Sequence, residues 1–203
     1  TVVAAVSADP GHLNPAITTG SPTHAVADSL FSGLLALDEK GEPRPDLAER
    51  WQLSEDGMRA RFELAPNAKW HDGRPVTADD VKFTFENVLL RHHARTRASL
   101  GPVLDTIEVL SPTSLEFRMK RPYPALVQQL DVTEAPILPR HVYGESDIEK
   151  NPANLKPVGS GPFRFESYTK DDRVVLARNP GYFKPGLPKV DRLVFRVIPD
   201  GAT

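Results

Sequence analysis

The chain has 203 residues, of which 39% are apolar and 26% charged, a balance typical of a folded globular protein rather than of a disordered one. Its 25 Lys and Arg residues against 27 Asp and Glu residues give a formal charge of −2, so the sequence lacks the basic excess that drives binding to nucleic acids. The absence of cysteine excludes disulfides, thiolate nucleophiles and cysteine-based metal centres.

The N-terminal region predicts a strand, a loop and a helix, in that order. Residues 1–7 are rich in β-branched side chains and predict a short buried strand. Residues 13–23 are mostly polar and contain prolines and a glycine, as loops do. After His24, four apolar residues recur at spacings of four, four and three: Val26, Leu30, Leu34 and Leu37. This spacing predicts a helix that starts near His24.

Alternation of apolar and polar residues predicts three β-hairpins further along the chain. Their turns lie at residues 54–57, 111–113 and 169–172. Residues 193–197 alternate in the same way and predict a last strand.

The middle of the chain predicts one long helix and two short ones. Thr77 and Asp80 fit an N-cap and the third helical position of a capping box. Four apolar residues then share one helix face: Val81, Phe85, Val88 and Leu89. Prolines start the two short helical segments at 124–130 and 139–143. The polar stretch 147–157 is the best internal boundary.

Few side chains suggest catalysis or metal binding. The histidines never form the H-E-x-x-H spacing of a zinc site, and residues 91–97 (RHHARTR) predict the solvated, basic end of the long helix. His71 and Asp72 are adjacent, which does not create the geometry of an acid–base pair. Ser160 lies between two glycines, but a strand follows, so we predict a bend that uses the conformational freedom of glycine rather than a nucleophile elbow. No catalytic residue, metal ligand or cofactor is predicted, and no apolar run approaches the roughly 20 residues that cross a bilayer.

Residues 45–89 carry the most specific pattern of the chain, PDLAERWQLSEDGMRARFELAPNAKWHDGRPVTADDVKFTFENVL. Shorter motifs flank it in order: LNP at 13–15, FSGL at 31–34, PRHV at 139–142, PVGSGPF at 157–163 and RNPGYF at 178–183. Together these motifs resemble the family 5 extracellular solute-binding proteins, the peptide-, dipeptide- and nickel-binding components of bacterial ABC importers. The resemblance covers essentially the whole chain.

The resemblance implies a mixed α/β fold of the type II periplasmic-binding-protein class, in which two lobes close around a cleft. It implies that this chain is the first part of the first lobe and that the second lobe follows near Thr203. Residues 1–37 and 154–203 would then form one mixed sheet. Residues 38–153 would form the inserted subdomain of hairpins and helices that is typical of peptide binders.

The resemblance also implies a substrate-binding component that captures a peptide or a similar small solute and delivers it to the membrane permease of an ABC importer. It implies a monomer in the periplasm or on the extracellular face of the bacterial cell envelope. Nucleic acid is not an expected partner, and the membrane is contacted only through the permease or a lipid anchor. A ligand-sensing domain of a transcription regulator is the alternative, and an enzyme is a third reading.

Ligand contacts are expected in the loop ahead of His24, because the corresponding loop lines the cleft in the family. Here the loop carries hydroxyls and a glycine that permits close approach of a ligand to the backbone. The expected ligand-binding residues are Thr18, Thr19, Gly20, Ser21 and Thr23. Since the groups that grip peptide termini lie largely on the second lobe of related binders, this chain alone is expected to bind ligand weakly or not at all.

Overall fold

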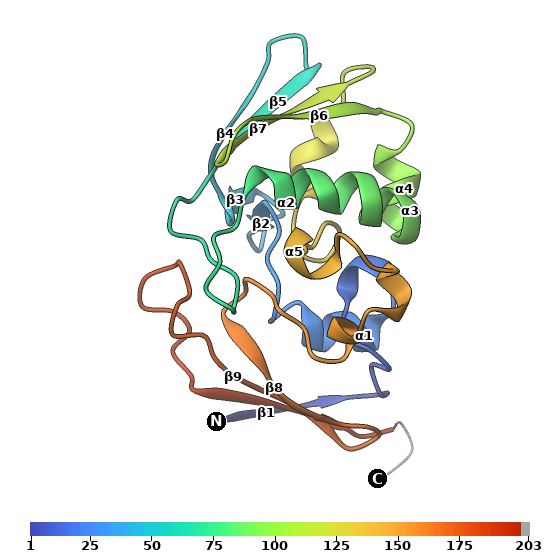
Figure 1. Cartoon of the computed structure of the whole chain (residues 1–203), viewed down its shortest axis with the longest axis vertical. Helices are drawn as coiled ribbons and strands as arrows, with labels where there is room; N and C mark the ends of the chain where they lie inside the picture. Colours follow the sequence, from blue (N-terminus) through green and yellow to red (C-terminus); the bar gives the residue numbers. More distant parts are fainter. Residues whose placement is uncertain (200–203) are drawn as a thin grey trace.

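Two four-stranded sheets lie at opposite ends of the molecule, with a layer of helices between them (Figure 1). The computed structural model describes residues 1–199 of the chain. We call β4, β5, β7 and β6 the upper sheet, and β1, β10, β9 and β8 the lower sheet, as they stand in Figure 1. The mixed α/β fold that the resemblance implied is confirmed.

The lower sheet joins the two ends of the chain. Its strands, in spatial order, are β1 (Val2–Val6), β10 (Arg192–Val197), β9 (Arg173–Arg178) and β8 (Phe163–Thr169). β8 and β9 form the predicted hairpin, β9 pairs antiparallel with β10, and β1 pairs parallel with β10. A mixed sheet built from both ends of the chain is therefore observed. The proposed division into residues 1–37 with 154–203 and residues 38–153 stays a prediction, and residues 200–203 lie outside the described part.

β1 is an exposed edge strand, so the prediction of a buried strand at residues 1–7 is wrong in that respect. Val2 is 45% and Val3 61% exposed, and Val6 alone in this strand is buried. At the sheet edge β1 has only β10 beside it. β-Branched side chains favour an extended backbone, whereas burial depends on what packs against the strand.

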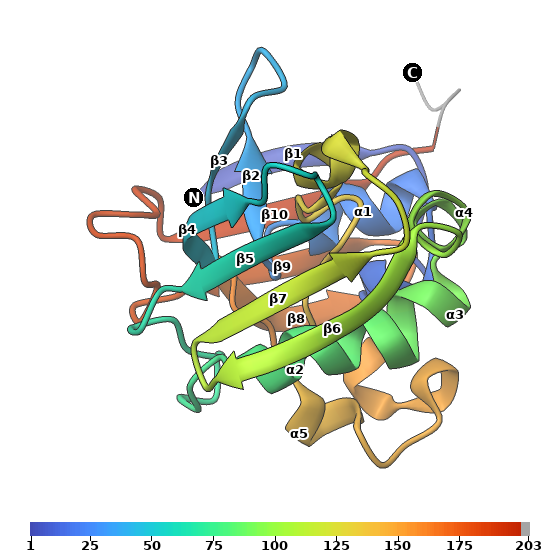
Figure 2. The same cartoon turned by 90° about the horizontal axis from the view of Figure 1, so that it is seen from above.

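The upper sheet is antiparallel and made of two hairpins (Figure 2). Its strands are β4 (Ala48–Leu53), β5 (Arg59–Leu64), β7 (Ser114–Met119) and β6 (Leu104–Ser111). Phe62 and Phe117 are buried on its inner face and meet edge to face at 5.3 Å between ring centroids. Phe85 of the helical layer contacts Phe117 in the same way at 5.0 Å. The hairpins predicted around residues 54–57 and 111–113 are confirmed.

The long helical segment under the upper sheet consists of α2 (Ala78–Phe83), a π-helical turn η2 (Thr84–Leu89) and α3 (Leu90–His92). The capping box is confirmed, since the Asp80 carboxylate accepts a hydrogen bond from the Thr77 amide at 2.9 Å. The predicted apolar face is fully buried at Val81, Phe85, Val88 and Leu89. The π turn begins at Thr84, whose hydroxyl donates to the Asp80 carbonyl oxygen at 2.7 Å.

The first helix is shorter than predicted and begins earlier. α1 spans Ser21–Ala27, and the predicted continuation to Leu37 is wrong because β2 (Leu35–Leu37) pairs there with β3 (Pro43–Pro45). The Leu35 amide donates to the Leu130 carbonyl oxygen at 3.0 Å. Tertiary hydrogen bonds therefore override the helical spacing of the leucines.

Short helical turns connect the remaining elements. They are η1 (Pro15–Ile17), α4 (Ala94–Leu100), η3 (Pro124–Gln129), α5 (Arg140–Tyr143), η4 (Ile148–Lys150) and η5 (Pro152–Asn154). The two proline-started segments are thus helical, the first as a 3-10 helix. Among residues 1–199, none of the helices has the length and apolar character required to cross a membrane.

Candidate ligand-binding site

Residues 18–23, which we call the Thr18–Thr23 loop, comprise Thr18 to Gly20 and the first turn of α1, and two of their hydroxyls hold the backbone of this region. The prediction that residues 13–23 form one loop is therefore wrong at residues 15–17 (η1) and 21–23 (α1). The Thr18 hydroxyl accepts a hydrogen bond from the Gly20 amide at 3.0 Å. The Thr23 hydroxyl is buried and donates to the Pro10 carbonyl oxygen at 3.0 Å. These two side chains therefore hold the loop in shape, and they face its interior contacts rather than open solvent.

The outer surface of the same loop is formed by Thr19, Gly20 and Ser21. The side chains of Thr19 and Ser21 are exposed. Gly20 has an extended backbone with φ of −73°, so its conformation does not require glycine, but a Cβ there would lie 3.1 Å from Thr18 Oγ1 and crowd the hydroxyl that accepts from the Gly20 amide. Two exposed hydroxyls and an accessible backbone are suitable partners for a polar ligand.

The His24 side chain contacts the backbone of this loop at Thr18. Its Nε2 lies 3.0 Å from the Thr18 carbonyl oxygen, and its Nδ1 lies 2.9 Å from Asp28 Oδ1. The other carboxylate oxygen of Asp28 accepts from the Thr133 hydroxyl at 3.0 Å. Sequence reasoning missed this chain of contacts. The spacing of four between His24 and Asp28 on a helix indicates that their side chains can meet. Thr133 lies 105 residues from Asp28, and no pattern in the sequence indicates that contact.

Burial disfavours a charge on His24, but the hydrogen bonds to Asp28 and Thr18 and the negative charge of Asp28 outweigh it and raise the pKa of His24 above its ordinary value. The carboxylate and the carbonyl oxygen thus stabilise the charged form of this buried ring.

His93 contradicts the prediction that residues 91–97 form a solvated basic helix end. Its ring is fully buried and caps α4, with Nδ1 2.8 Å from the Thr96 hydroxyl. Its centroid lies 6.1 Å from that of His24. Burial, followed by the positive charges of His24 and Arg95, lowers the pKa of His93 to about 4. The chain therefore breaks into two helices here because the histidine turns inward to cap the second one.

The segment 159–161 joins the lower sheet to the rest of the molecule. A Cβ at Gly159 would lie 1.8 Å from the Leu30 carbonyl oxygen, and one at Gly161 2.7 Å from the Leu30 carbonyl carbon. Neither glycine has a positive φ, so the predicted need for conformational freedom is wrong, and close packing against Leu30 is the reason for glycine. Ser160 between them is fully buried.

His71 locks this segment with both ring nitrogens. Its Nδ1 accepts a hydrogen bond from the Gly159 amide at 3.1 Å, which leaves Nε2 as the protonated nitrogen that donates to the Gly161 carbonyl oxygen at 3.1 Å. Burial lowers the pKa of His71 to about 4. The Asp72 carboxylate contacts His141 instead, at 2.6 Å, so the adjacent pair His71 and Asp72 does not form an acid–base couple.

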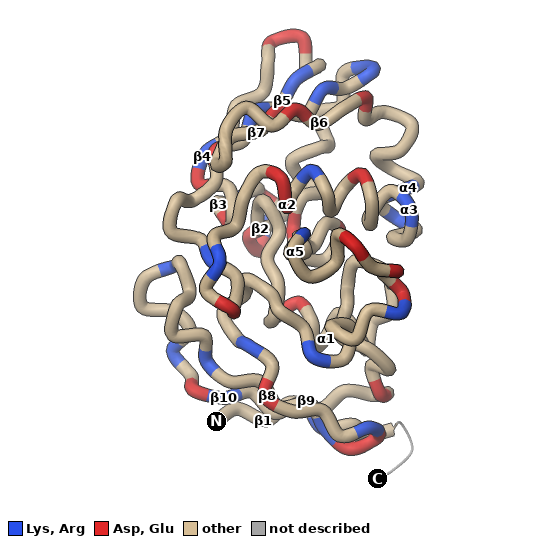
Figure 3. Tube along the Cα trace, viewed as in Figure 1, with Lys and Arg blue, Asp and Glu red and all other residues tan. Residues whose placement is uncertain are grey.

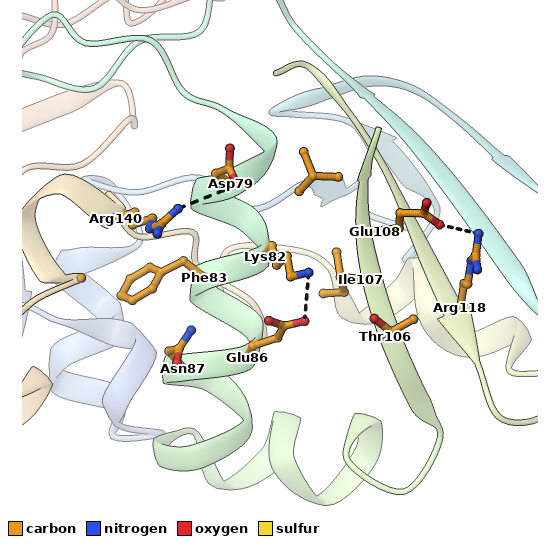
Figure 4. Close-up of a pocket in the computed structure, with 12 residues that line it drawn as sticks. Asp79, Lys82, Phe83, Glu86, Asn87, Thr106, Ile107, Glu108, Arg118 and Arg140 are labelled. Carbon is orange, nitrogen blue, oxygen red and sulfur yellow. Dashed lines mark ion pairs between the residues drawn. The ribbon is translucent and has the colours of Figure 1, made fainter. Parts of the chain in front are cut away.

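A surface groove of about 800 Å³ lies between the long helical segment and β6 (Figure 4). Three ion pairs occur among the residues that line it: Lys82–Glu86, Arg140–Asp79 and Arg118–Glu108. Its three cations are thus matched by three carboxylates, and residues 18–23 contribute nothing to its lining. In Figure 3, Lys and Arg residues alternate with Asp and Glu residues on both sheets and on the helical layer of the described part of the chain. Within residues 1–199, no group of three or more His, Asp and Glu side chains is arranged to hold a metal ion.

The sequence and the fold of this chain are similar to those of known proteins. The family model for bacterial extracellular solute-binding proteins, family 5 Middle, matches residues 42–203. A putative ABC transporter peptide-binding protein of Brucella ovis is 34% identical over 200 residues, which are 95% of this chain and 36% of that protein. The oligopeptide-binding protein AppA of Bacillus subtilis is 32% identical over 197 residues, with 95% of this chain and 36% of AppA covered.

A solved structure shows the same relationship. The periplasmic binding protein DppA of Helicobacter pylori, determined in complex with the peptide STSA, superposes with a TM-score of 0.85 at 26% identity, covering 98% of this chain and 42% of DppA. This chain thus spans less than half the length of the relatives that it matches. By its sequence and its fold, the chain belongs to the family 5 bacterial extracellular solute-binding proteins.

Proposed function

We propose that this chain is the ligand-holding first-lobe part of a substrate-binding component of an ABC importer, which captures a peptide or a similar small solute and delivers it to a membrane permease. The observation that carries the proposal is the Thr18–Thr23 loop at the start of α1, where the exposed Thr19 and Ser21 flank Gly20 and the Thr18 carbonyl contacts His24. A binding protein needs such a preformed polar surface and no activated nucleophile.

The names of the relatives favour this role over the two alternatives. AppA is named for oligopeptide binding and DppA was solved with a peptide, so a peptide is the first candidate ligand. A regulatory ligand sensor has no support among these relatives, and the family is a solute-binding rather than a catalytic one. We propose a function without catalysis, in the periplasm or on the extracellular face of the envelope, as a monomer that meets the membrane through the permease or a lipid anchor.

The five expected ligand-binding residues divide into two roles in this proposal. Thr19, Gly20 and Ser21 contact the ligand, because Thr19 and Ser21 are exposed and the half-buried Gly20 lies between them. Thr18 and Thr23 hold that surface in place through their hydrogen bonds to Gly20 and Pro10. Main-chain hydrogen bonds to an extended peptide would recognise its backbone and leave its side chains free to vary.

NMR titration of the 203-residue chain with dialanine and tetraalanine tests the proposal. We expect the amide signals of Thr19, Gly20 and Ser21 to shift with a Kd weaker than about 1 mM, which corresponds to about −4 kcal/mol, because a single lobe cannot enclose its ligand. The double variant Thr19→Ala/Ser21→Ala should weaken the shifts of neighbouring amides, while Thr169→Ala, an exposed threonine at the end of β8, should not. Shifts confined to the groove beside β6 would overturn the assignment of the site, and sub-micromolar binding would overturn the expected dependence on a second lobe.

A further inference from the structure

A continuous chain of contacts runs from the segment after η3 to the Thr18–Thr23 loop. Thr133 donates to Asp28 Oδ2 at 3.0 Å, Asp28 Oδ1 lies 2.9 Å from His24 Nδ1, and His24 Nε2 lies 3.0 Å from the Thr18 carbonyl oxygen. Thr18 is the first residue of the loop that carries Thr19, Gly20 and Ser21. The loop is thereby tied to two other parts of the chain, the helix α1 and the segment after η3.

The chemistry of the two His24 contacts determines how many protons the ring needs. A carboxylate and a backbone carbonyl are both hydrogen-bond acceptors without a proton to donate. An imidazole ring satisfies two acceptors only when both its nitrogens carry a proton, which is the charged imidazolium form. In the neutral form one nitrogen would present a lone pair to an oxygen at about hydrogen-bond distance, which is repulsive.

The charged groups around His24 come from three elements. Asp28 lies on α1 itself, and His93 and Arg95 lie at and just after the start of α4. Glu134, on the segment after η3, pairs with Arg95 at 3.1 Å, which offsets the repulsion between Arg95 and His24. Asp131, on the same segment, lies close enough to Asp28 that the charge of Asp28 contributes, after burial, to raising the pKa of Asp131.

His93 strengthens the assignment of the charge to His24. Its Nε2 is buried and has no hydrogen-bond partner among the described residues. A charged His93 would carry a proton on both nitrogens, so Nδ1 could no longer accept from the Thr96 amide and Nε2 would be a buried donor without an acceptor, which costs free energy. Of the two neighbouring rings, only His24 therefore has the partners to hold a positive charge.

We propose that charged His24 holds the Thr18–Thr23 loop in its observed shape and releases it when the ring loses a proton, so that His24 and Asp28 are positioning residues for the ligand-binding loop. The link to ligand rests on the proposed function, whereas the response of the loop to protonation does not. When one proton leaves, the remaining N–H stays with the carboxylate, because charge-assisted hydrogen bonds are roughly twice as strong as neutral ones. The contact with the Thr18 carbonyl is then the one that is lost.

NMR titration of the 203-residue chain without ligand, from about pH 5.5 to about pH 9, tests this switch. The ring nitrogens of His24, the carbonyl carbon of Thr18 and the amide of Thr19 are followed together. We expect all three to change along one curve, because the Thr18 carbonyl loses its donor as the ring titrates. A Thr18 carbonyl signal that stays constant while the His24 ring titrates would overturn the proposal.

Two variants sharpen the result. Asp28→Asn removes the negative charge and should lower the midpoints of the His24 ring and of the Thr18 carbonyl together, by about one pH unit or more. His92→Gln is the matched control, since its ring is only partly buried and pairs with the exposed Glu149 at 3.3 Å, and it should leave both midpoints unchanged. Midpoints that separate in Asp28→Asn would contradict the coupling. If that variant does not fold, His24→Gln should make the Thr18 carbonyl signal independent of pH, and a persistent titration would contradict the proposal.

The experiment keeps the two proposals apart. Peptide-induced shifts at Thr19 and Ser21 report the proposed function, and the ligand-free pH titration reports the switch. Either can fail while the other stands.

Discussion

The upper and lower sheets differ in how far apart along the chain their paired strands lie. In the upper sheet, β4 with β5 and β6 with β7 are hairpins of consecutive strands, joined by the longer-range β5–β7 pair, and the inner face buries Phe62 and Phe117 completely. In the lower sheet, β8 and β9 form a hairpin, but β1 pairs with β10 in a register that aligns Val2 with Leu193. Most of β1 is exposed on both faces.

This difference indicates which sheet contributes more to the free energy of unfolding. Closing a short hairpin loop costs little conformational entropy, and the upper sheet gains a buried aromatic cluster in return. The β1–β10 ladder closes a loop of almost the whole chain and buries little of β1. Its contacts therefore form late in folding and contribute less to the free energy of unfolding. The upper sheet should therefore dominate the measured stability, and the joint at residues 159–161 should determine whether the two sheets unfold together.

Removing a buried ring from the upper sheet should have the largest effect. Phe117→Ala deletes a fully buried side chain that contacts Phe62 and Phe85, and we expect a loss of about 4 kcal/mol in the free energy of unfolding, measured in urea. Val3→Ala is the counterpart in the lower sheet, where the side chain is 61% exposed, and should change stability by less than about 0.5 kcal/mol. Equal losses for the two variants would refute the contrast between the sheets.

Disturbing the joint should have the next largest effect. Gly159→Ala places a Cβ 1.8 Å from the Leu30 carbonyl oxygen, a backbone atom that cannot move aside alone, and should cost about 3 kcal/mol. Gly181→Ala is the control, because its Cβ would meet only Asn179 Oδ1, at 3.5 Å. Urea unfolding followed by tryptophan fluorescence measures both. A neutral Gly159→Ala would show that the close approach at Leu30 is not a constraint.

Acid should weaken the joint through His71. Because burial lowers the pKa of His71 in the folded chain to about 4 from 6.5, the unfolded chain takes up this proton first as the pH falls. The contribution of His71 is thus complete above pH 6.5 and is lost as the pH falls toward 4, with an upper limit of about 3 kcal/mol.

Urea midpoints measured at intervals between these two pH values test the role of His71. The His71→Gln variant, which cannot titrate, should lose less stability over this range than the unaltered chain. His141→Gln, which alters a more exposed ring paired with Asp72, should behave like the unaltered chain. Parallel curves for all three proteins would show that the neutral His71 ring does not hold the joint.

The candidate site was predictable only in part. The loop containing Thr18–Thr23 was identified through the resemblance of the whole chain to a family, and its hydroxyls were visible in the sequence. The division of those hydroxyls into inward and outward ones was not visible, because the contact of Thr23 with Pro10 depends on the path of the backbone. The burial of His93 was missed for a similar reason, since a basic, polar heptapeptide suggests solvent and only packing shows otherwise.

The sequence by itself determined the elements whose signals lie within a few residues: the three hairpins, the capping box of Thr77 and Asp80, and the buried face that includes Val81 and Phe85. These follow from the backbone periods of about 2 and 3.6 residues and from local hydrogen bonding. The tertiary structure alone decided that β1 is exposed, that α1 ends at Ala27, and that Thr133 reaches Asp28. Those outcomes depend on which distant segments supply the neighbouring atoms, and no local pattern encodes that choice.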